Sequence, residues 1–151
     1  MTAKDRLAEL GITLPPTATP AGSYVPTVQT GNLLFTAGQL PYVDGRLPAT
    51  GRVGNEVSPE DAKNHARQAA LNLLAAVDAA VGLDAVERVV KVVGFVASAE
   101  GFTGQPGVIN GASDLFAEVF GDAGVHARSA VGVAELPLGA PVEVEAILQV
   151  R

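Results

Sequence analysis

The chain has 151 residues and no cysteine, 48% hydrophobic and 17% charged residues, and a formal net charge of −6, which is typical of one compact domain over residues 1–151. The negative charge, without any Lys/Arg cluster, counts against binding of nucleic acid or an anionic membrane, and the lack of cysteine excludes disulfides, thiolate catalysis and cysteine–metal sites. Because the N-terminus has no signal-like apolar core and no apolar run reaches membrane-spanning length, we expect a cytoplasmic protein.

Residues 1–21 are predicted to form an N-terminal arm. A short amphipathic helix would run from Thr2 to Leu10, with Thr2 as its N-cap and Gly11 as its end. Residues 14–22 contain three prolines, which favour extended, irregular chain. We therefore expect the arm to lie over a surface and not to belong to the core.

Two strand-like runs, Ser23–Val28 and Leu33–Ala37, predict a β-hairpin that turns at Thr30-Gly31-Asn32. Residues 42–57 should then form a loop or a small hairpin, for which Asp44-Gly45 is the best turn signal. The loop offers no residue pattern that indicates chemistry.

Two helices and a strand are predicted between residues 58 and 120. Ser58 is a typical N-cap with proline after it, and apolar residues repeat at helical spacing until Gly82. Val86–Ala97 has apolar residues at both parities, which predicts a central strand covered on both faces. After a connector at 102–108, Asn110–Phe120 predicts a second helix with one apolar face.

The last predicted element is a second hairpin, with strands Ala127–Ala134 and Val142–Val150 around a Pro-containing bend. In that hairpin Arg128 would pair near Leu148 or Gln149, and Glu143 near Glu135 or Ala134. The arginine and the glutamate would then be well separated within one chain. If they serve one site, a second subunit would have to complete it.

The element order predicts an α+β fold, with a mostly antiparallel sheet and two helices packed on one face. The other face of the sheet is also largely apolar. An identical subunit is the simplest cover for that face.

Arg128 and Glu143 are the main candidates for chemistry. An arginine in an apolar strand is costly unless its guanidinium is paired or solvated. It could clamp a small carboxylate ligand, or simply pair with Glu143 or Glu145 or lie at an exposed strand end. Glu143 could hold a water and take its proton, or be a solvated side chain, and the alternation does not distinguish it from Glu145.

Four other residues carry weaker signals. Tyr24 could line a pocket or be an ordinary packed aromatic, and Gly38 could allow close approach of a ligand or form a bulge. His126 could line the site, although a turn residue is the simpler interpretation, and His65 is expected at the surface. Neither histidine has a partner at metal-ligand spacing.

A group of segments carries a resemblance to a known family. They are Gly22-Ser23-Tyr24, Gly31 to Pro41, Asn110, Ala127-Arg128-Ser129, and Leu136-Pro137 with Val142 to Ile147. Together they resemble the RidA (YjgF/YER057c/UK114) family, whose members are also labelled endoribonuclease L-PSP or reactive intermediate deaminase. The resemblance extends from Gly22 to Arg151.

The resemblance implies a fold similar to the trimeric type of chorismate mutase, in which three subunits close their sheets into a central barrel with sites between subunits. It also implies hydrolysis of small 2-imino acids or enamines to 2-keto acids and ammonia, without a metal or organic cofactor.

The same resemblance assigns roles to individual residues. Arg128 matches the carboxylate-binding arginine, and Glu143 the glutamate that places or activates the water. Tyr24 matches a pocket tyrosine, Asn110 an asparagine near the site, and Gly38 a glycine whose backbone lies at the ligand.

The chain departs from the family pattern at several positions, which indicates a divergent subgroup. Ala130 stands where many members have cysteine, His126 replaces a common proline, and Ser23 replaces the proline of a Gly-Pro-Tyr segment. The N-terminal arm and the long 42–57 loop are additional. Two other functions stay open: a non-catalytic, regulatory trimeric binder of small carboxylates, and an endoribonuclease, against which the net charge counts.

Overall fold

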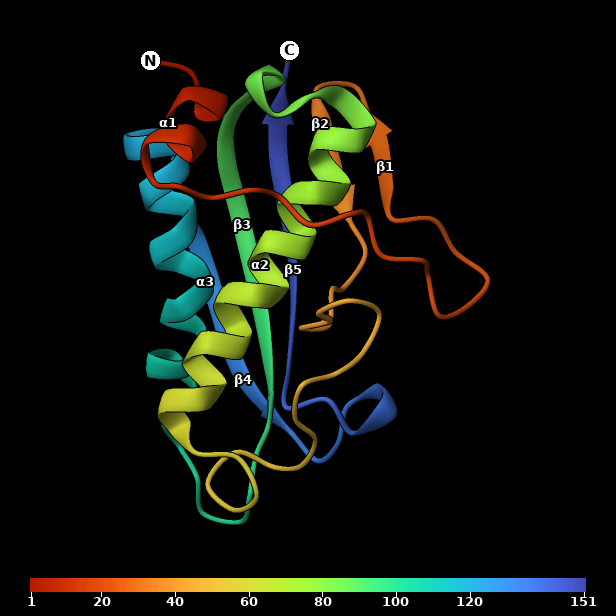
Figure 1. Ribbon diagram of the computed structural model, residues 1–151, viewed down its shortest axis with the longest axis vertical. Coiled ribbons are helices and arrows are strands. Elements are labelled where there is room, and N and C mark those ends of the chain that lie inside the picture. The colour runs from red at the N-terminus through yellow and green to blue at the C-terminus, as the bar shows by residue number, and fades with distance from the viewer.

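The computed structural model describes all 151 residues as one five-stranded sheet with helices on one face (Figure 1). The strand order is β1-β2-β5-β3-β4, and every pair is antiparallel except β3–β4. The elements are α1 (Ala3–Glu9), β1 (Thr27–Thr30), β2 (Leu33–Thr36), α2 (Pro59–Val81), β3 (Val86–Ala97), α3 (Gln105–Phe120), β4 (Ala127–Val133) and β5 (Val142–Val150). The predicted α+β architecture is confirmed.

The helix ends follow from local chemistry. Ser58 Oγ accepts the backbone N–H of Asp61 at 3.1 Å, so the first turn of α2 is capped as predicted. Gly82 ends α2 at a positive φ of 78°, a conformation open to glycine. Helix α3 begins at Gln105, five residues before the predicted start at Asn110. Pro106 is compatible with this start, because backbone N–H groups in the first turn of a helix have no partner within the helix.

The predicted C-terminal hairpin is wrong. Strand β4 pairs in parallel with β3, and β5 lies on the other side of β3, between β3 and β2. A helix precedes β4, and a strand–helix–strand unit favours a parallel neighbour. Glu143 therefore lies opposite Phe95, and Arg128 opposite Val92, instead of the partners predicted from a hairpin.

The first hairpin is shorter than predicted. Its strand β1 begins at Thr27, because Pro26 interrupts the preceding residues. The 42–57 loop contains the expected small turn, with a bridge between Val43 and Arg46 around Asp44-Gly45.

The core lies between α2, α3 and one face of the sheet. Small side chains let α2 approach the sheet closely, and Phe116 of α3 is its largest fully buried side chain. The opposite sheet face is open: Val93 and Phe95 are half-buried, and Phe35 and Val131 are exposed. Within one chain, the helices cover strand β3 on one face only, so cover on both faces stays a prediction that needs a second subunit.

The N-terminal arm runs across the outer side of α2, as Figure 1 shows in red and orange. Helix α1 is capped by Thr2, as predicted, and packs on α3. Residues 14–22 form neither helix nor strand, and Thr17 Oγ1 lies 3.5 Å from the carbonyl oxygen of Ala75. No helix has the length and apolar character needed to cross a membrane.

Candidate functional site

Arg128 and Glu143 lie on opposite faces of the sheet, and the other residues singled out from the sequence are grouped below with one or the other. Paired residues of neighbouring strands project to the same face. Arg128 pairs with buried Val92, so its side chain lies on the helical face, whereas Glu143 pairs with half-buried Phe95 on the open face. We call them the arginine group (Arg128, Asn110, Ala130) and the glutamate group (Glu143, Gly38, Tyr24).

The guanidinium of Arg128 is held by helix α3. Its Nη1 donates to Asn110 Oδ1 at 2.8 Å and to Ser113 Oγ at 3.2 Å, and its Nη2 donates to the Pro106 carbonyl at 3.3 Å. None of the ion pairs in the structure includes Arg128, so pairing with Glu143 or Glu145 does not occur. A fixed cation without a carboxylate partner can accept an anionic ligand.

Ser113, which was not among the residues singled out from the sequence, joins His126 to the arginine group. Its Oγ lies 2.9 Å from His126 Nε2, and His126 Nδ1 lies 2.6 Å from the Gly124 carbonyl. The imidazole also meets the edge of Phe116 at a centroid distance of 5.9 Å. The spacing of Asn110 and Ser113 by three residues on one helix could have revealed that both share a face.

Ala130 follows Arg128 on the same face of β4, where it packs against a buried cluster that contains Ile109. The side-chain and carbonyl partners of the guanidinium therefore all come from α3. Ala130 itself offers no polar atom beyond its backbone.

Glu143 has a half-buried carboxyl group that makes no hydrogen bond or ion pair within the chain. Burial raises the pKa of Glu143, and the negative charge of Glu145 raises it further. A raised pKa makes the Glu143 carboxylate a stronger base, as a group that takes a proton from water requires.

Gly38 lies directly against the Glu143 carboxylate. A Cβ atom at Gly38 would overlap Glu143 Oε2, so this position has no room for a side chain while the carboxylate stays in place. The backbone of Gln39 exchanges two hydrogen bonds with Val144, at 2.8 and 3.1 Å, which fixes this approach.

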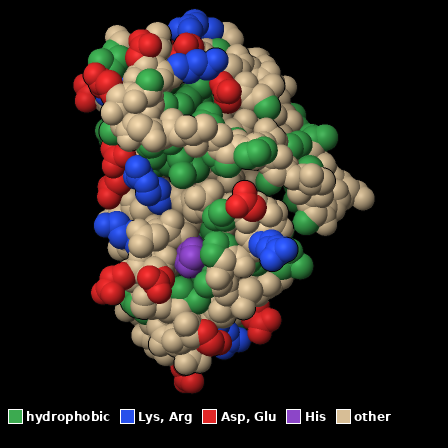
Figure 2. All heavy atoms as spheres, in the orientation of Figure 1, with side chains coloured by type: hydrophobic (Ala, Val, Ile, Leu, Met, Phe, Trp, Pro, Cys, Tyr) green, Lys and Arg blue, Asp and Glu red, His purple; other side chains and the backbone are tan.

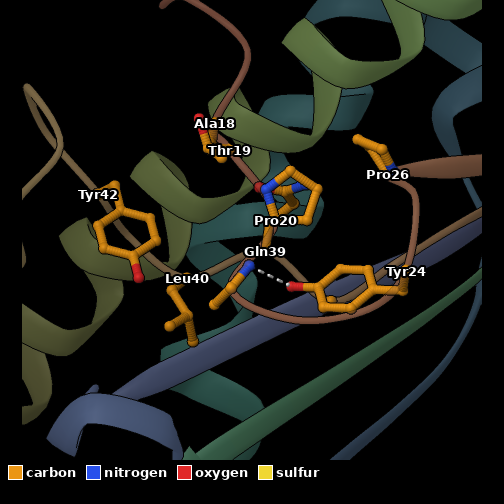
Figure 3. Close-up of a pocket in the computed structure, with 10 residues that line it drawn as sticks. Ala18, Thr19, Pro20, Tyr24, Pro26, Gln39, Leu40 and Tyr42 are labelled. Carbon is orange, nitrogen blue, oxygen red and sulfur yellow. Dashed lines mark hydrogen bonds between the residues drawn. The ribbon is translucent and has the colours of Figure 1, made fainter.

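Tyr24 lies beside the same glycine in a pocket beneath the N-terminal arm (Figure 3). Its hydroxyl accepts the backbone N–H of Ala21 at 3.1 Å, and its ring extends across the pocket toward Gln39 and Pro20. The arm therefore contributes a wall of the pocket, which the sequence did not predict. The lining residues are Ala18, Thr19, Pro20, Ala21, Tyr24, Pro26, Gly38, Gln39, Leu40 and Tyr42.

The remaining titratable residues do not form a metal site. No group of three or more His, Asp or Glu side chains is arranged to hold a metal ion. His65 is half-buried, not exposed as predicted, and this burial lowers its pKa. The charges on the face seen in Figure 2 are scattered, with no continuous basic area.

A family profile described as Endoribonuclease L-PSP matches residues 16–150. Protein TCP17 of Trypanosoma cruzi is 47% identical over 147 residues, covering 96% of this chain and 92% of the relative. The 2-iminobutanoate/2-iminopropanoate deaminase of Escherichia coli K12 is 37% identical over 126 residues, covering 83% of this chain and 86% of the relative.

Solved structures share the fold. The Agrobacterium tumefaciens protein Atu1372, described as having unknown function, superposes with a TM-score of 0.91 at 47% identity, covering 99% of this chain and 92% of the other. The E. coli YjgF gene product gives a TM-score of 0.67 at 33% identity, with coverages of 89% and 94%. E. coli TdcF with bound serine gives a TM-score of 0.65 at 29% identity, with coverages of 92% and 95%. The predicted YjgF-type fold is confirmed.

Proposed function

Because the chain belongs to the endoribonuclease L-PSP family, which includes the RidA/YjgF proteins, we propose that it hydrolyses small 2-imino acids to 2-keto acids and ammonia. The observation that carries the proposal is the Arg128 guanidinium, which is held in place and has no carboxylate partner. The deaminase relative and the serine-bound TdcF structure support a small carboxylate as the ligand.

In this reaction Arg128 binds the substrate carboxylate through N–H donors that face away from α3. The Glu143 carboxylate takes a proton from a water molecule while the water oxygen bonds to the imine carbon. Glu143 returns that proton to the imine nitrogen, which gives a carbinolamine. The proton of the new hydroxyl group then passes to the same nitrogen as the C–N bond breaks, so that ammonia leaves and the keto group forms. The raised pKa of Glu143 makes its carboxylate a stronger base toward the water.

Within one chain, Arg128 and Glu143 lie too far apart to contact the same small substrate. They are two strands apart in the sheet and three residues apart in register, or roughly 10 Å across and roughly 10 Å along the strands, on opposite faces. We therefore propose that copies of the chain associate through the open, apolar sheet face as a homotrimer. Arg128 of one copy and Glu143 of the next would then form each site.

The experiment measures keto-acid and ammonia release from 2-iminobutanoate, generated in place by an amino-acid oxidase. Wild type should exceed the buffer rate, and Arg128→Ala and Glu143→Ala should not. A wild type no faster than buffer that still binds 2-oxobutanoate would instead indicate the non-catalytic binder. RNA cleavage that survives both substitutions would indicate the endoribonuclease.

Mixing the two inactive variants tests the shared site. Random mixed trimers should recover about a quarter of the wild-type activity, because each site needs an intact arginine from one copy and an intact glutamate from its neighbour. A site within one chain would recover nothing. Light scattering on the same samples checks the oligomeric state.

A further inference from the structure

We infer that His126 is a positioning residue that acts through Ser113 to orient the Arg128 guanidinium. His126 Nε2 lies 2.9 Å from Ser113 Oγ, and the same oxygen accepts from Arg128 Nη1 at 3.2 Å. Three side chains from α3, β4 and the residue before β4 thus form one continuous hydrogen-bonded chain. Testing this positioning role with a carboxylate ligand rests on the proposed function.

The direction of each hydrogen bond in this chain follows from donor and acceptor chemistry. Arginine can only donate, so the Ser113 oxygen accepts from Nη1 and its single O–H is free to donate to His126 Nε2. His126 must then carry its proton on Nδ1, where it donates to the Gly124 carbonyl at 2.6 Å. Each group donates to the next, an arrangement in which neighbouring hydrogen bonds strengthen one another.

The imidazole has a fixed place from which to act. Gly124 is the last residue of the 3-10 turn Gly121–Gly124 after α3, and the fully buried Phe116 ring packs against the imidazole. His126 therefore connects the end of α3 to the start of β4, where Arg128 lies. Without the imidazole, the Ser113 hydroxyl could rotate to another acceptor, and the guanidinium would lose a defined partner.

Ser113 and His126 are also within the distance expected of a nucleophile and its base. Ser113 Oγ, however, lies between the imidazole and the guanidinium and already interacts with both. This arrangement orients the arginine and leaves the serine oxygen poorly placed to attack a substrate.

The test compares 2-oxobutanoate affinity and imine turnover in His126→Ala, Ser113→Ala and the double variant. Each single substitution should raise Kd and KM about fivefold to tenfold with kcat within about twofold, because the clamp is affected and the water is not. The double variant should be no worse than Ser113→Ala, since His126 acts through the serine. Ser113→Thr should restore wild-type affinity, and His65→Ala is the matched histidine control.

A second measurement separates failure of this inference from failure of the proposed function. Nitrogen NMR of the Arg128 side chain should show restricted guanidinium rotation in wild type that is lost in His126→Ala and kept in His65→Ala. If wild type binds no 2-oxobutanoate, the proposed function fails, and this signal still decides the inference. An unchanged Arg128 signal in folded His126→Ala, or a loss of kcat without a change in KM, would overturn the positioning role.

Discussion

The arginine group and the glutamate group differ in how many hydrogen bonds the chain provides to their charged side chains. The Arg128 guanidinium has three hydrogen bonds, all to residues of α3. The Glu143 carboxyl has none, and it lies between the bare backbone of Gly38 and the like charge of Glu145. A well-satisfied cation is suited to binding, whereas a poorly satisfied carboxylate holds a proton more readily and is suited to proton transfer.

The surrounding structure explains this difference. Arg128 is on the helical face, where α3 supplies an amide, a hydroxyl and a carbonyl group. Glu143 is on the open sheet face, among half-buried apolar side chains such as Phe95. The geometry of the arginine group is thus complete within one chain, while the surroundings of Glu143 depend on what covers the open face.

The largest expected effect is that of Glu143→Gln on turnover. The amide keeps the size of the side chain but cannot take a proton, so kcat should fall by about 10²- to 10⁴-fold. Affinity for 2-oxobutanoate, measured by calorimetry, should stay within about threefold because the arginine group is intact. Glu145→Gln is the matched control on the same strand and should keep turnover within about threefold. An equal loss of kcat in Glu143→Gln and Glu145→Gln would contradict a specific role of Glu143 in proton transfer.

Arg128→Lys, which changes the arginine group, should have the next largest effect, and this effect should be on ligand affinity. Lysine keeps the charge but loses the planar fork that binds a carboxylate and α3 together. Losing charge-assisted hydrogen bonds should weaken 2-oxobutanoate binding by about 10- to 100-fold. At saturating imine, kcat should be much less affected than KM. Wild-type affinity in this variant would show that charge alone, and not orientation, binds the ligand.

Gly38→Ala should have a smaller effect that separates position from chemistry. The new methyl group would push the end of the flexible Glu143 side chain aside while leaving the carboxyl group itself intact. Turnover should fall about tenfold or more, because small displacements of a catalytic group are costly. The free energy of unfolding should change by less than about 1 kcal/mol. Unchanged turnover would mean that the position of Glu143 is not critical.

The sequence predicted the parts of the structure that depend on local chemistry. The caps of α1 and α2 and the turn at Asp44-Gly45 were recognisable, because each is specified by a few adjacent residues. The order of the last strands was not, since sheet pairing depends on which neighbour a crossover helix brings alongside. Two apolar strands joined by a bend are compatible with a hairpin or with insertion of β3 between them.

The candidate site was predictable to a different extent. Arg128 and Glu143 stood out because charged residues are uncommon in such apolar strands. Ser113 did not, because its three-residue spacing from Asn110 places both residues on one face of a helix but does not show that this face lies beside Arg128. The contribution of the N-terminal arm to the Tyr24 pocket was equally hidden, since contacts between distant segments follow from the fold.

The smallest expected effect concerns stability and completes the comparison. Burial raises the pKa of Glu143 above its value of 4.5 in an unfolded chain, so between these two pKa values the folded state binds more protons than the unfolded state. Stability then falls as pH rises through this window. Well below pH 4.5 the carboxyl is protonated in both states, and no penalty remains. Glutamine carries no charge at any pH and avoids the penalty.

Urea unfolding of wild type and Glu143→Gln across this range measures the difference. The variant should gain stability relative to wild type as pH rises, by well under about 1 kcal/mol because the carboxyl is only half-buried. Arg128→Lys should show no such pH-dependent gain, because this substitution leaves the Glu143 carboxyl group in place. A difference in the free energy of unfolding between wild type and Glu143→Gln that stays constant with pH would mean that the open face does not destabilise the charged carboxylate. A growing gap would mean that the substitution that removes turnover also stabilises the fold, as expected where an active site retains an unsatisfied charge.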